Sequence, residues 1–172
     1  MCSEAKPLAP GRLERLDQCL WVGVGSAHGD DAWGWHAALA LVRMRPAIAH
    51  RVRLIRTPAD LCQAVAGVRR LEILDACRGL GPPGQLLCGR WSSRWRLSGA
   101  WSSSHAFDVA SALELAKTLG ELPATTMVWV ATSEYASARS SEHLSERLQA
   151  ALPAMVGRIA AAADRTLRRL AT

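Results

Sequence analysis

The stretch CLWVGVGSAHGDDAWGW, residues 19–35, decides the fold of this chain. It opens with a short apolar run that ends at a glycine, which is typical of a buried strand. Two neighbouring acids, Asp30 and Asp31, follow the strand, and apolar residues then recur at a helical spacing. That apolar stripe consists of Trp35, Ala38, Leu39 and Val42. A strand that turns directly into a helix is the building unit of an α/β fold.

The rest of the chain continues this alternation of strands and helices. Further strands are predicted at residues 51–56, 71–76, 85–91 and 127–132, which are short runs rich in apolar residues. Helices are predicted around residues 61–68, 106–116 and 144–170, with a restart of the last helix at Pro153. The order predicts an α/β three-layer sandwich, in which helices cover both faces of a mostly parallel five-stranded sheet. Residues 85–91 form the one antiparallel strand of that sheet.

The helix after the second strand carries its own start signal. Thr57 is a capping residue type, and Pro58 suits the first helical position. Asp60 stands where a carboxylate meets the free amides of the first turn. We therefore expect this helix to begin at about residue 58.

A chain of 172 residues is long enough for one domain with a buried core. We expect a single domain over residues 1–172, in which residues 17–172 fold and residues 1–16 form a loose leader. The five cysteines include no C-x-x-C pair, which favours reduced thiols over a zinc site or a disulfide framework. No apolar run has the length of a signal peptide or a membrane span, so we expect a cytoplasmic protein without a membrane partner.

The net charge of +6 comes from 21 basic and 15 acidic residues that are spread along the chain. Dispersed arginine is more typical of a solvated surface than of a nucleic-acid interface, so no nucleic-acid partner is expected. Residues 90–101, RWSSRWRLSGAW, interleave arginine with tryptophan, a pattern that suits base stacking or the docking of a protein partner. Their rough alternation also fits an edge strand, which is the interpretation we prefer.

Three polar residues mark the ends of elements where an α/β sheet keeps its chemistry. Asp31 follows the first strand, Asp75 ends the otherwise apolar third strand, and His105 in the loop SSSH precedes the third helix. Such sheets bind ligands at the carboxyl ends of their strands, near the topological switch point. The three side chains converge there if the first and third strands are neighbours.

Such a trio suits two kinds of chemistry. Imidazole and carboxylate both bind nickel or zinc, and a carboxylate beside a histidine is also suited to activating water. Each residue has a structural interpretation as well: Asp31 as a helix cap, Asp75 as a turn cap before a glycine-rich loop, and His105 as a structural histidine. Asp30 is the better candidate for capping the helix, because it stands one residue further from it.

Three blocks of sequence resemble, in order, the motifs of the hydrogenase maturation endopeptidase family. GVGSAHGDDAWGW looks like the family's opening G-x-G-N strand and its paired acids. LEILDACRGLGPPG is similar to its buried strand that ends in Asp before a Pro-Gly loop. SSHAFDVASALELAKTLGELP resembles its Ser-His segment, its next helix and its Leu-Gly-x-x-Pro exit. The likeness covers about residues 20–160, nearly the whole expected domain.

This resemblance implies an endopeptidase, a hydrolase that removes the C-terminal extension of a nickel-iron hydrogenase large-subunit precursor after nickel insertion. Matched position by position, the family's nickel-sensing and catalytic residues are Asp31, Asp75 and His105. The resemblance implies no permanent cofactor, because nickel arrives in the substrate and is contacted only transiently. Either Asp31 or Asp75 would activate water near the metal. The expected partner is the precursor, and a monomer is favoured.

The sequence departs from the family pattern at three positions outside the trio. Ser26 replaces an Asn of the family pattern. In ATSEYAS, residues 131–137, Thr132 and Tyr135 replace the Gly and Pro of a Gly-Ile-Glu-Pro pattern, while Glu134 keeps the acid. These changes suggest a divergent branch with a different precursor or a lower activity.

Five tryptophans are further candidates for function, because large aromatic side chains near a site often anchor a protein partner. The alternative for each of them is core packing, which is the expectation for Trp35. The five residues are Trp33, Trp35, Trp91, Trp95 and Trp101.

Other protein classes fit the sequence less well. The glycines of GVGSAHG give a G-x-G-x-x-x-G pattern, as in a dinucleotide-binding module, but the paired acids that follow would repel a pyrophosphate. A serine hydrolase built on residues 102–105 lacks a G-x-S-x-G elbow. A non-catalytic assembly factor of the same fold, which binds the large subunit without cutting it, stays the alternative. Such a factor would keep its function when Asp31 and His105 are both replaced.

Overall fold

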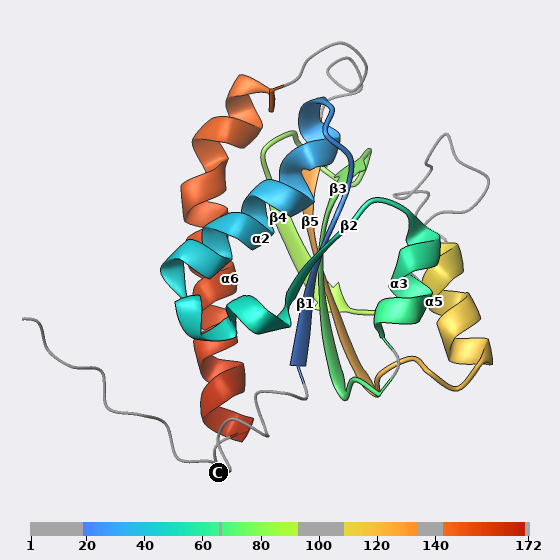
Figure 1. The fold of residues 1–172 in the computed structure, drawn as a ribbon. Coiled ribbons are helices and arrows are strands. Elements are labelled where there is room, and N and C mark those ends of the chain that lie inside the picture. The colour runs from blue at the N-terminus through green and yellow to red at the C-terminus, as the bar shows by residue number, and fades with distance from the viewer. Residues whose placement is uncertain (1–18, 66, 93–108, 134–142, 171–172) are drawn as a thin grey trace, which may run out of the picture.

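The computed structural model describes residues 19–65, 67–92, 109–133 and 143–170 (Figure 1). The strands are β1 (Cys19–Val24), β2 (Val52–Ile55), β3 (Arg70–Arg78), β4 (Leu86–Arg90) and β5 (Thr125–Ser133). The helices are α2 (Trp33–Met44), α3 (Pro58–Ala64), α5 (Val109–Thr118) and α6 (Glu146–Leu170), with 3-10 turns η1 (Gly29–Ala32) and η2 (Pro46–Arg51). The leader predicted at residues 1–16 lies outside the described residues.

The strands form one sheet in the order β2-β1-β3-β5-β4. β1 pairs in parallel with β2 and β3, and β3 pairs in parallel with β5. β4 pairs antiparallel with β5. The predicted α/β fold, a mostly parallel five-stranded sheet with one antiparallel strand, is therefore confirmed.

Helices cover both faces of the sheet, as predicted. α2 and α6 lie on one face, and α3 and α5 lie on the other (Figure 1). Trp21 and Leu74 belong to the core under α2 and α6, whereas Val22 and Ile73 belong to the core under α3 and α5. Alternate residues of β1 and β3 thus enter opposite layers, as the pleat of a strand requires.

α3 begins where its sequence predicts. Thr57 and Asp60 form a capping box: Thr57 Oγ1 accepts a hydrogen bond from the Asp60 N–H, and Asp60 Oδ2 accepts one from the Thr57 N–H. Two backbone amides at the start of the helix are satisfied in this way.

α2 lies unusually close to the sheet, because glycines occupy the contact. A Cβ atom added to Gly34 would overlap the carbonyl oxygens of Val24 and Leu74. On the side of the sheet, a Cβ atom added to Gly23 would stand 2.5 Å from the Gly34 carbonyl oxygen and 2.9 Å from the Cβ atom of Ala38. Backbone therefore meets backbone where α2 crosses β1 and β3.

We predict that Gly34→Ala lowers the free energy of unfolding by at least about 1–3 kcal/mol, the usual cost of overpacking. The added methyl group would meet two backbone oxygens, which cannot rotate away as a side chain can. Urea unfolding followed by circular dichroism measures the effect. Gly157→Ala is the matched control, because a Cβ atom there has nothing within 4 Å and alanine favours the interior of α6. Wild-type stability of Gly34→Ala would show that α2 shifts freely on the sheet.

The buried face of α2 differs from the predicted stripe. The residues of α2 that are buried are Trp33, Gly34, Ala37, Ala38 and Leu41. Leu39, which was expected in the core, is 45% exposed. Apolar residues occupy more than one face of this helix, and the close contact at Gly34 selects the face that packs on the sheet.

α6 is a single helix, so the predicted restart at Pro153 is wrong. Proline has no amide N–H and costs a helix interior about 3 kcal/mol. Buried apolar residues nevertheless continue on both sides of the proline, namely Leu148, Met155, Val156 and Ile159. Burial of this stripe outweighs the lost hydrogen bond, and one continuous helix is kept.

β3 is not apolar up to Asp75, because Glu72 lies in its middle and is only 3% exposed. Arg70 Nε donates to Glu72 Oε1 at 2.7 Å, and the Trp129 indole N–H donates to Glu72 Oε2 at 2.7 Å. Both carboxylate oxygens are thus satisfied, as a buried charge requires. Sequence reasoning missed this network because its tryptophan is 57 residues away and meets Glu72 only through the sheet.

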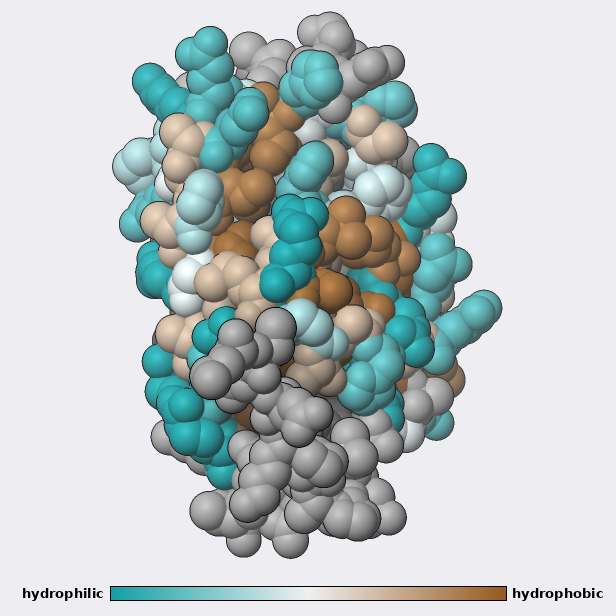
Figure 2. All heavy atoms as spheres, turned by 60° about the vertical axis from the view of Figure 1, so that its left-hand side comes forward, coloured by the Kyte–Doolittle hydropathy of each residue, from teal (hydrophilic) through white to brown (hydrophobic). Residues whose placement is uncertain are grey.

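Figure 2 shows the side of the molecule on which α6 lies. Apolar side chains gather in the middle of this face, and hydrophilic side chains flank them. No helix in the described part of the chain has the length and apolar character needed to cross a bilayer.

The four cysteines that the structure describes are free thiols, as their spacing predicts. Cys19 and Cys77 are buried in the two cores. Burial, followed by the charge of Asp75, raises the pKa of the Cys77 thiol to about 12. These buried thiols therefore act as small apolar side chains.

Candidate active site

The carboxyl ends of β1 and β3 lie side by side, because these strands are neighbours in the sheet. Gly23 pairs with Leu74, so Asp75 is level with the end of β1. From β1 the chain passes through α2 to β2 on one side, while β3 lies on the other side (Figure 1). This arrangement is a topological switch point. The neighbour relation on which the predicted site depends is therefore present.

The turn η1 carries the paired acids past the end of β1. Gly25, with a φ of 152°, leaves room for the turn, since a Cβ atom there would overlap the Asp31 carbonyl oxygen. The two acids have opposite environments, because Asp30 is buried and Asp31 is exposed. Asp31 is thus open to a substrate, whereas Asp30 is enclosed by the protein.

The prediction that Asp30 caps the helix after it is wrong. Ala32, the N-cap residue of α2, makes no side-chain capping bond, and neither does His28 before η1. Asp30 Oδ1 instead accepts a hydrogen bond of 2.7 Å from the backbone N–H of Ser145, immediately before α6. The two residues are 115 positions apart, so no local pattern in the sequence indicates this bond.

Asp75 is a buried acid with an exposed acid nearby. Burial raises the pKa of the Asp75 carboxyl well above its ordinary value, and the negative charge of Asp31 raises it further. The Ala76 N–H, which donates to Asp75 Oδ1 at 2.8 Å, opposes these effects only in part. Asp75 therefore keeps its proton to a higher pH than an ordinary aspartate does. The carboxylate of Asp31, which is near Asp75, is open to solvent.

Asp75 makes the stability of the protein depend on pH. Its pKa is higher in the folded state than in the unfolded state, so the folded state binds more protons between the two values. The free energy of unfolding therefore falls as the pH rises through that window, which begins near the unfolded value of about 3.9. We predict that Asp75→Asn, measured by urea unfolding, is more stable than the wild type at pH 7 and loses this advantage near pH 4.

Asp164→Asn is a matched control with the opposite sign. The Arg45 guanidinium donates hydrogen bonds to Asp164 and lowers its pKa, so this carboxylate stabilises the fold at neutral pH and loses that effect in acid. The control variant should therefore be less stable than the wild type at pH 7 and similar to it in acid. If the gain of Asp75→Asn is the same at every pH, titration of Asp75 is not its cause.

His105 lies outside the described residues, as do Glu134 and Tyr135. Among the residues that the structure does describe, no three His, Cys, Asp or Glu side chains are grouped as a metal ion would require. The structure thus brings Asp31 and Asp75 near each other, and the third member of the predicted trio stays a prediction.

Thr132, which stands where the resemblance expects glycine, is fully buried at the end of β5. Its hydroxyl accepts a hydrogen bond of 2.9 Å from the Gln85 N–H and donates to the Pro82 carbonyl oxygen. The side chain therefore fastens the loop after β3 to β5. This loop follows directly from the strand that carries Asp75, so the departure adds a structural tie close to the candidate site.

Trp35 was expected to pack in the core, but it is Trp33 that does so. Trp33 is fully buried, whereas Trp35 is half-buried. The Trp35 indole N–H donates to the Ile55 carbonyl oxygen at 3.1 Å, and the Arg56 guanidinium lies 5.9 Å from the centroid of its ring. Trp35 therefore links α2 to the end of β2 at the surface of the protein.

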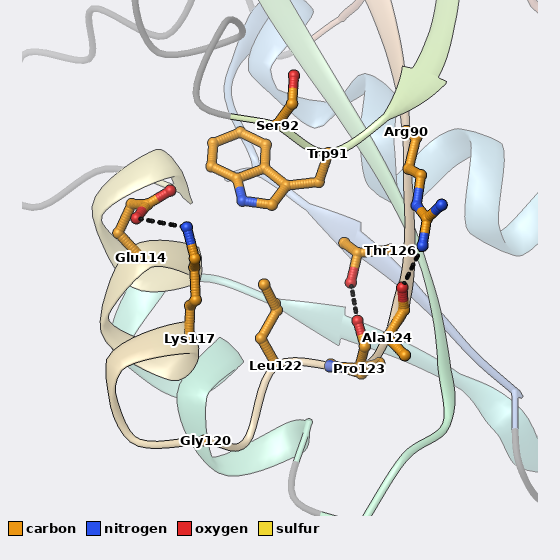
Figure 3. Close-up of a pocket in the computed structure, with 10 residues that line it drawn as sticks. All are labelled: Arg90, Trp91, Ser92, Glu114, Lys117, Gly120, Leu122, Pro123, Ala124 and Thr126. Carbon is orange, nitrogen blue, oxygen red and sulfur yellow. Dashed lines mark hydrogen bonds and ion pairs between the residues drawn. The ribbon is translucent and has the colours of Figure 1, made fainter.

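A cavity of about 460 Å³ lies at the edge of the sheet opposite to Asp75 (Figure 3). Trp91 lines this cavity together with Glu114 and Lys117, whose charged groups approach to 3.8 Å. The cavity contains none of the predicted site residues. The rest of the tryptophan-rich segment, residues 93–101, lies outside the described residues.

The fold is similar to solved structures of hydrogenase maturation enzymes. The hydrogenase maturating endopeptidase HybD from E. coli matches with a TM-score of 0.69 and 21% identity, over 87% of this chain and 93% of that chain. The NiFe hydrogenase maturation protease HybD from Thermococcus kodakarensis matches with a TM-score of 0.66 and 20% identity, over 83% and 96%. A hydrogenase 2 maturation peptidase from Thaumarchaeota archaeon SCGC_AB-539-E09 matches with a TM-score of 0.58 and 26% identity, over 86% of this chain and 98% of that chain.

The fold of this chain is that of the hydrogenase maturation proteases. The family resemblance of its sequence blocks is thereby confirmed, and the enzyme class that it implies agrees with the names of the similar structures. No family model matches the sequence, and no curated protein matches it.

Proposed function

We propose that this chain is an endopeptidase that removes the C-terminal extension of a nickel-iron hydrogenase large-subunit precursor after nickel insertion. The observation that carries the proposal is the pairing of exposed Asp31 with buried Asp75 at the switch point of a hydrogenase maturation protease fold. The similar structures are named as a maturation endopeptidase, protease and peptidase, which supports the same reaction here. We expect the protein to act as a monomer in the cytoplasm, without a permanent cofactor.

Chain connectivity supports the inclusion of His105 in the site. α5 begins at Val109 and runs toward the amino edge of the parallel strands, where β5 starts (Figure 1). The chain therefore enters α5 from the direction of the edge at which Asp75 lies. The proposed site combines Asp31, Asp75 and His105 on this basis.

The two carboxyl groups suit the two proton transfers of peptide hydrolysis. An exposed carboxylate accepts a proton from the attacking water, and an acid with a raised pKa donates one to the leaving amine. In the proposed reaction, Asp31 is the base and Asp75 is the acid. The water oxygen bonds to the scissile carbonyl carbon, the C–N bond breaks, and the amine leaves with the proton.

Nickel in the precursor is part of the substrate in this proposal. Carboxylate and imidazole are both ligands that nickel accepts, and a nearby cation favours the ionised form of a carboxyl group. Nickel would therefore lower the pKa of Asp75 and make it a better proton donor. Recognition by Asp31, Asp75 and His105 would restrict cleavage to precursors that already carry the metal.

We predict that the protein cuts the nickel-loaded large-subunit precursor and leaves the nickel-free precursor intact. Asp31→Ala and Asp75→Asn should each lower the rate of cleavage by about 10²–10⁴-fold, the range for loss of a general acid or base. His105→Ala should lower it as well, because an imidazole ligand for the nickel is lost. Mass spectrometry of the released C-terminal fragment provides the measurement. Glu121→Gln is the matched control, since this exposed carboxylate lies between α5 and β5, at the other edge of the sheet.

The same experiment separates the protease from an assembly factor. Binding of the precursor by the wild type without release of a fragment would replace the proposed function with the non-catalytic alternative. Equal cutting of both precursors would keep the protease and remove nickel recognition from the proposal.

A further inference from the structure

Two side chains cap the amino end of α6. One is that of Ser145, which directly precedes the helix, and the other is that of Asp30, from a distant part of the chain. The Ser145 carbonyl oxygen accepts the first helical hydrogen bond, from the Gln149 N–H at 2.9 Å, which makes Ser145 the N-cap residue. Ser145 Oγ accepts a hydrogen bond from the Leu148 N–H at 3.5 Å. In a capping box, the residue at the Leu148 position would supply a carboxylate to the N-cap amide. Leucine has none, and Asp30 supplies it instead, at 2.7 Å from the Ser145 nitrogen.

This hydrogen bond fastens the turn η1 to α6. Asp30 is only 1% exposed, and its neighbour Asp31 is exposed in the same four-residue turn. Gly25 bounds the turn from the side of β1, because it has room only for a hydrogen atom next to the Asp31 carbonyl oxygen. The position of Asp31 is therefore set by a steric contact on one side and by the Asp30 hydrogen bond on the other.

α2 and α6 are held together independently at their other ends. Arg45, which follows α2, donates to both carboxylate oxygens of Asp164 in α6, at 2.7 Å from Nε and 2.6 Å from Nη2. The two helices start at the same edge of the sheet, so one tie lies at each end of the pair (Figure 1). Loss of the Asp30 bond would therefore loosen the turn without releasing α6 from α2.

We propose that Asp30 is a positioning residue for cleavage: it anchors η1 to the amino end of α6 and thereby places the Asp31 carboxylate relative to Asp75. This inference rests on the proposed function and extends it to a residue that never touches the substrate. The two neighbouring acids then have separate tasks, one inside the protein and one in the crevice.

Replacement of Asp30 tests the proposal in the full-length protein with the nickel-loaded precursor. We expect Asp30→Ala to lower kcat more than about tenfold, the size expected for loss of a hydrogen bond to a charged group, with KM unchanged. Asp30→Asn keeps an oxygen that accepts the Ser145 N–H and should cleave within about threefold of the wild type. Asp164→Ala is the matched control: it removes the tie at the other end of the helix pair and should leave kcat unchanged.

The partner residue provides a second test that does not alter the acidic pair. Ser145→Ala keeps the backbone N–H that Asp30 binds, whereas Ser145→Pro removes it. We expect only Ser145→Pro to reproduce the loss of kcat, and adding Asp30→Ala to it should cause no further loss. Hydrogen exchange of the Ser145 amide should be faster in Asp30→Ala than in Asp30→Asn.

Two results would overturn this inference while leaving the proposed function intact. One is wild-type kcat in both Asp30→Ala and Ser145→Pro. The other is a loss in Asp30→Asn as large as that in Asp30→Ala, with equal exchange of the Ser145 amide in the two variants. Failure of the wild type to cut the precursor would instead overturn the proposed function itself, and the inference with it.

Discussion

The contact between the backbone of α2 and the backbones of β1 and β3 is the constraint on which the rest of the structure depends. Gly23 and Gly34 make it possible, because a side chain at Gly34 would overlap the carbonyl oxygens of the two strands. η1 directly precedes α2. The distance between α2 and the sheet therefore also affects the distance between the paired acids and the ends of the strands. Packing of the core and the position of η1 at the strand ends therefore both depend on this contact.

Three buried carboxyl groups have different tasks because their partners differ. Glu72 has an arginine and a tryptophan as hydrogen-bond donors, which makes it part of the framework of the sheet. Asp30 accepts a hydrogen bond from the backbone N–H of Ser145, the N-cap residue of the long helix α6. Asp75 has one backbone N–H and faces the charge of Asp31, so its proton is held more tightly than usual. A buried acid with a raised pKa at a switch point is where chemistry is expected.

Much of the fold was predictable, because the signals that specify it are local. Strands and helices have different apolar periods, and the capping box of Thr57 and Asp60 spans only one turn. The order of these elements then leaves few topologies open. The errors occurred where local rules compete with packing. Pro153 stops an isolated helix but not one whose apolar stripe is buried on both sides of it, and the apolar residues of α2 allowed more than one buried face.

The sequence by itself determined the order of the elements, the fold class and the strand ends at which Asp31 and Asp75 lie. Its motif blocks also indicated the family whose fold the chain has. Only the tertiary structure decided that Asp31 is exposed while Asp30 is buried against the start of α6, and that burial raises the pKa of Asp75. The physical reason is distance along the chain. Burial, hydrogen bonding and charge at this site arise from residues that meet only when β1, β3 and α6 are packed together.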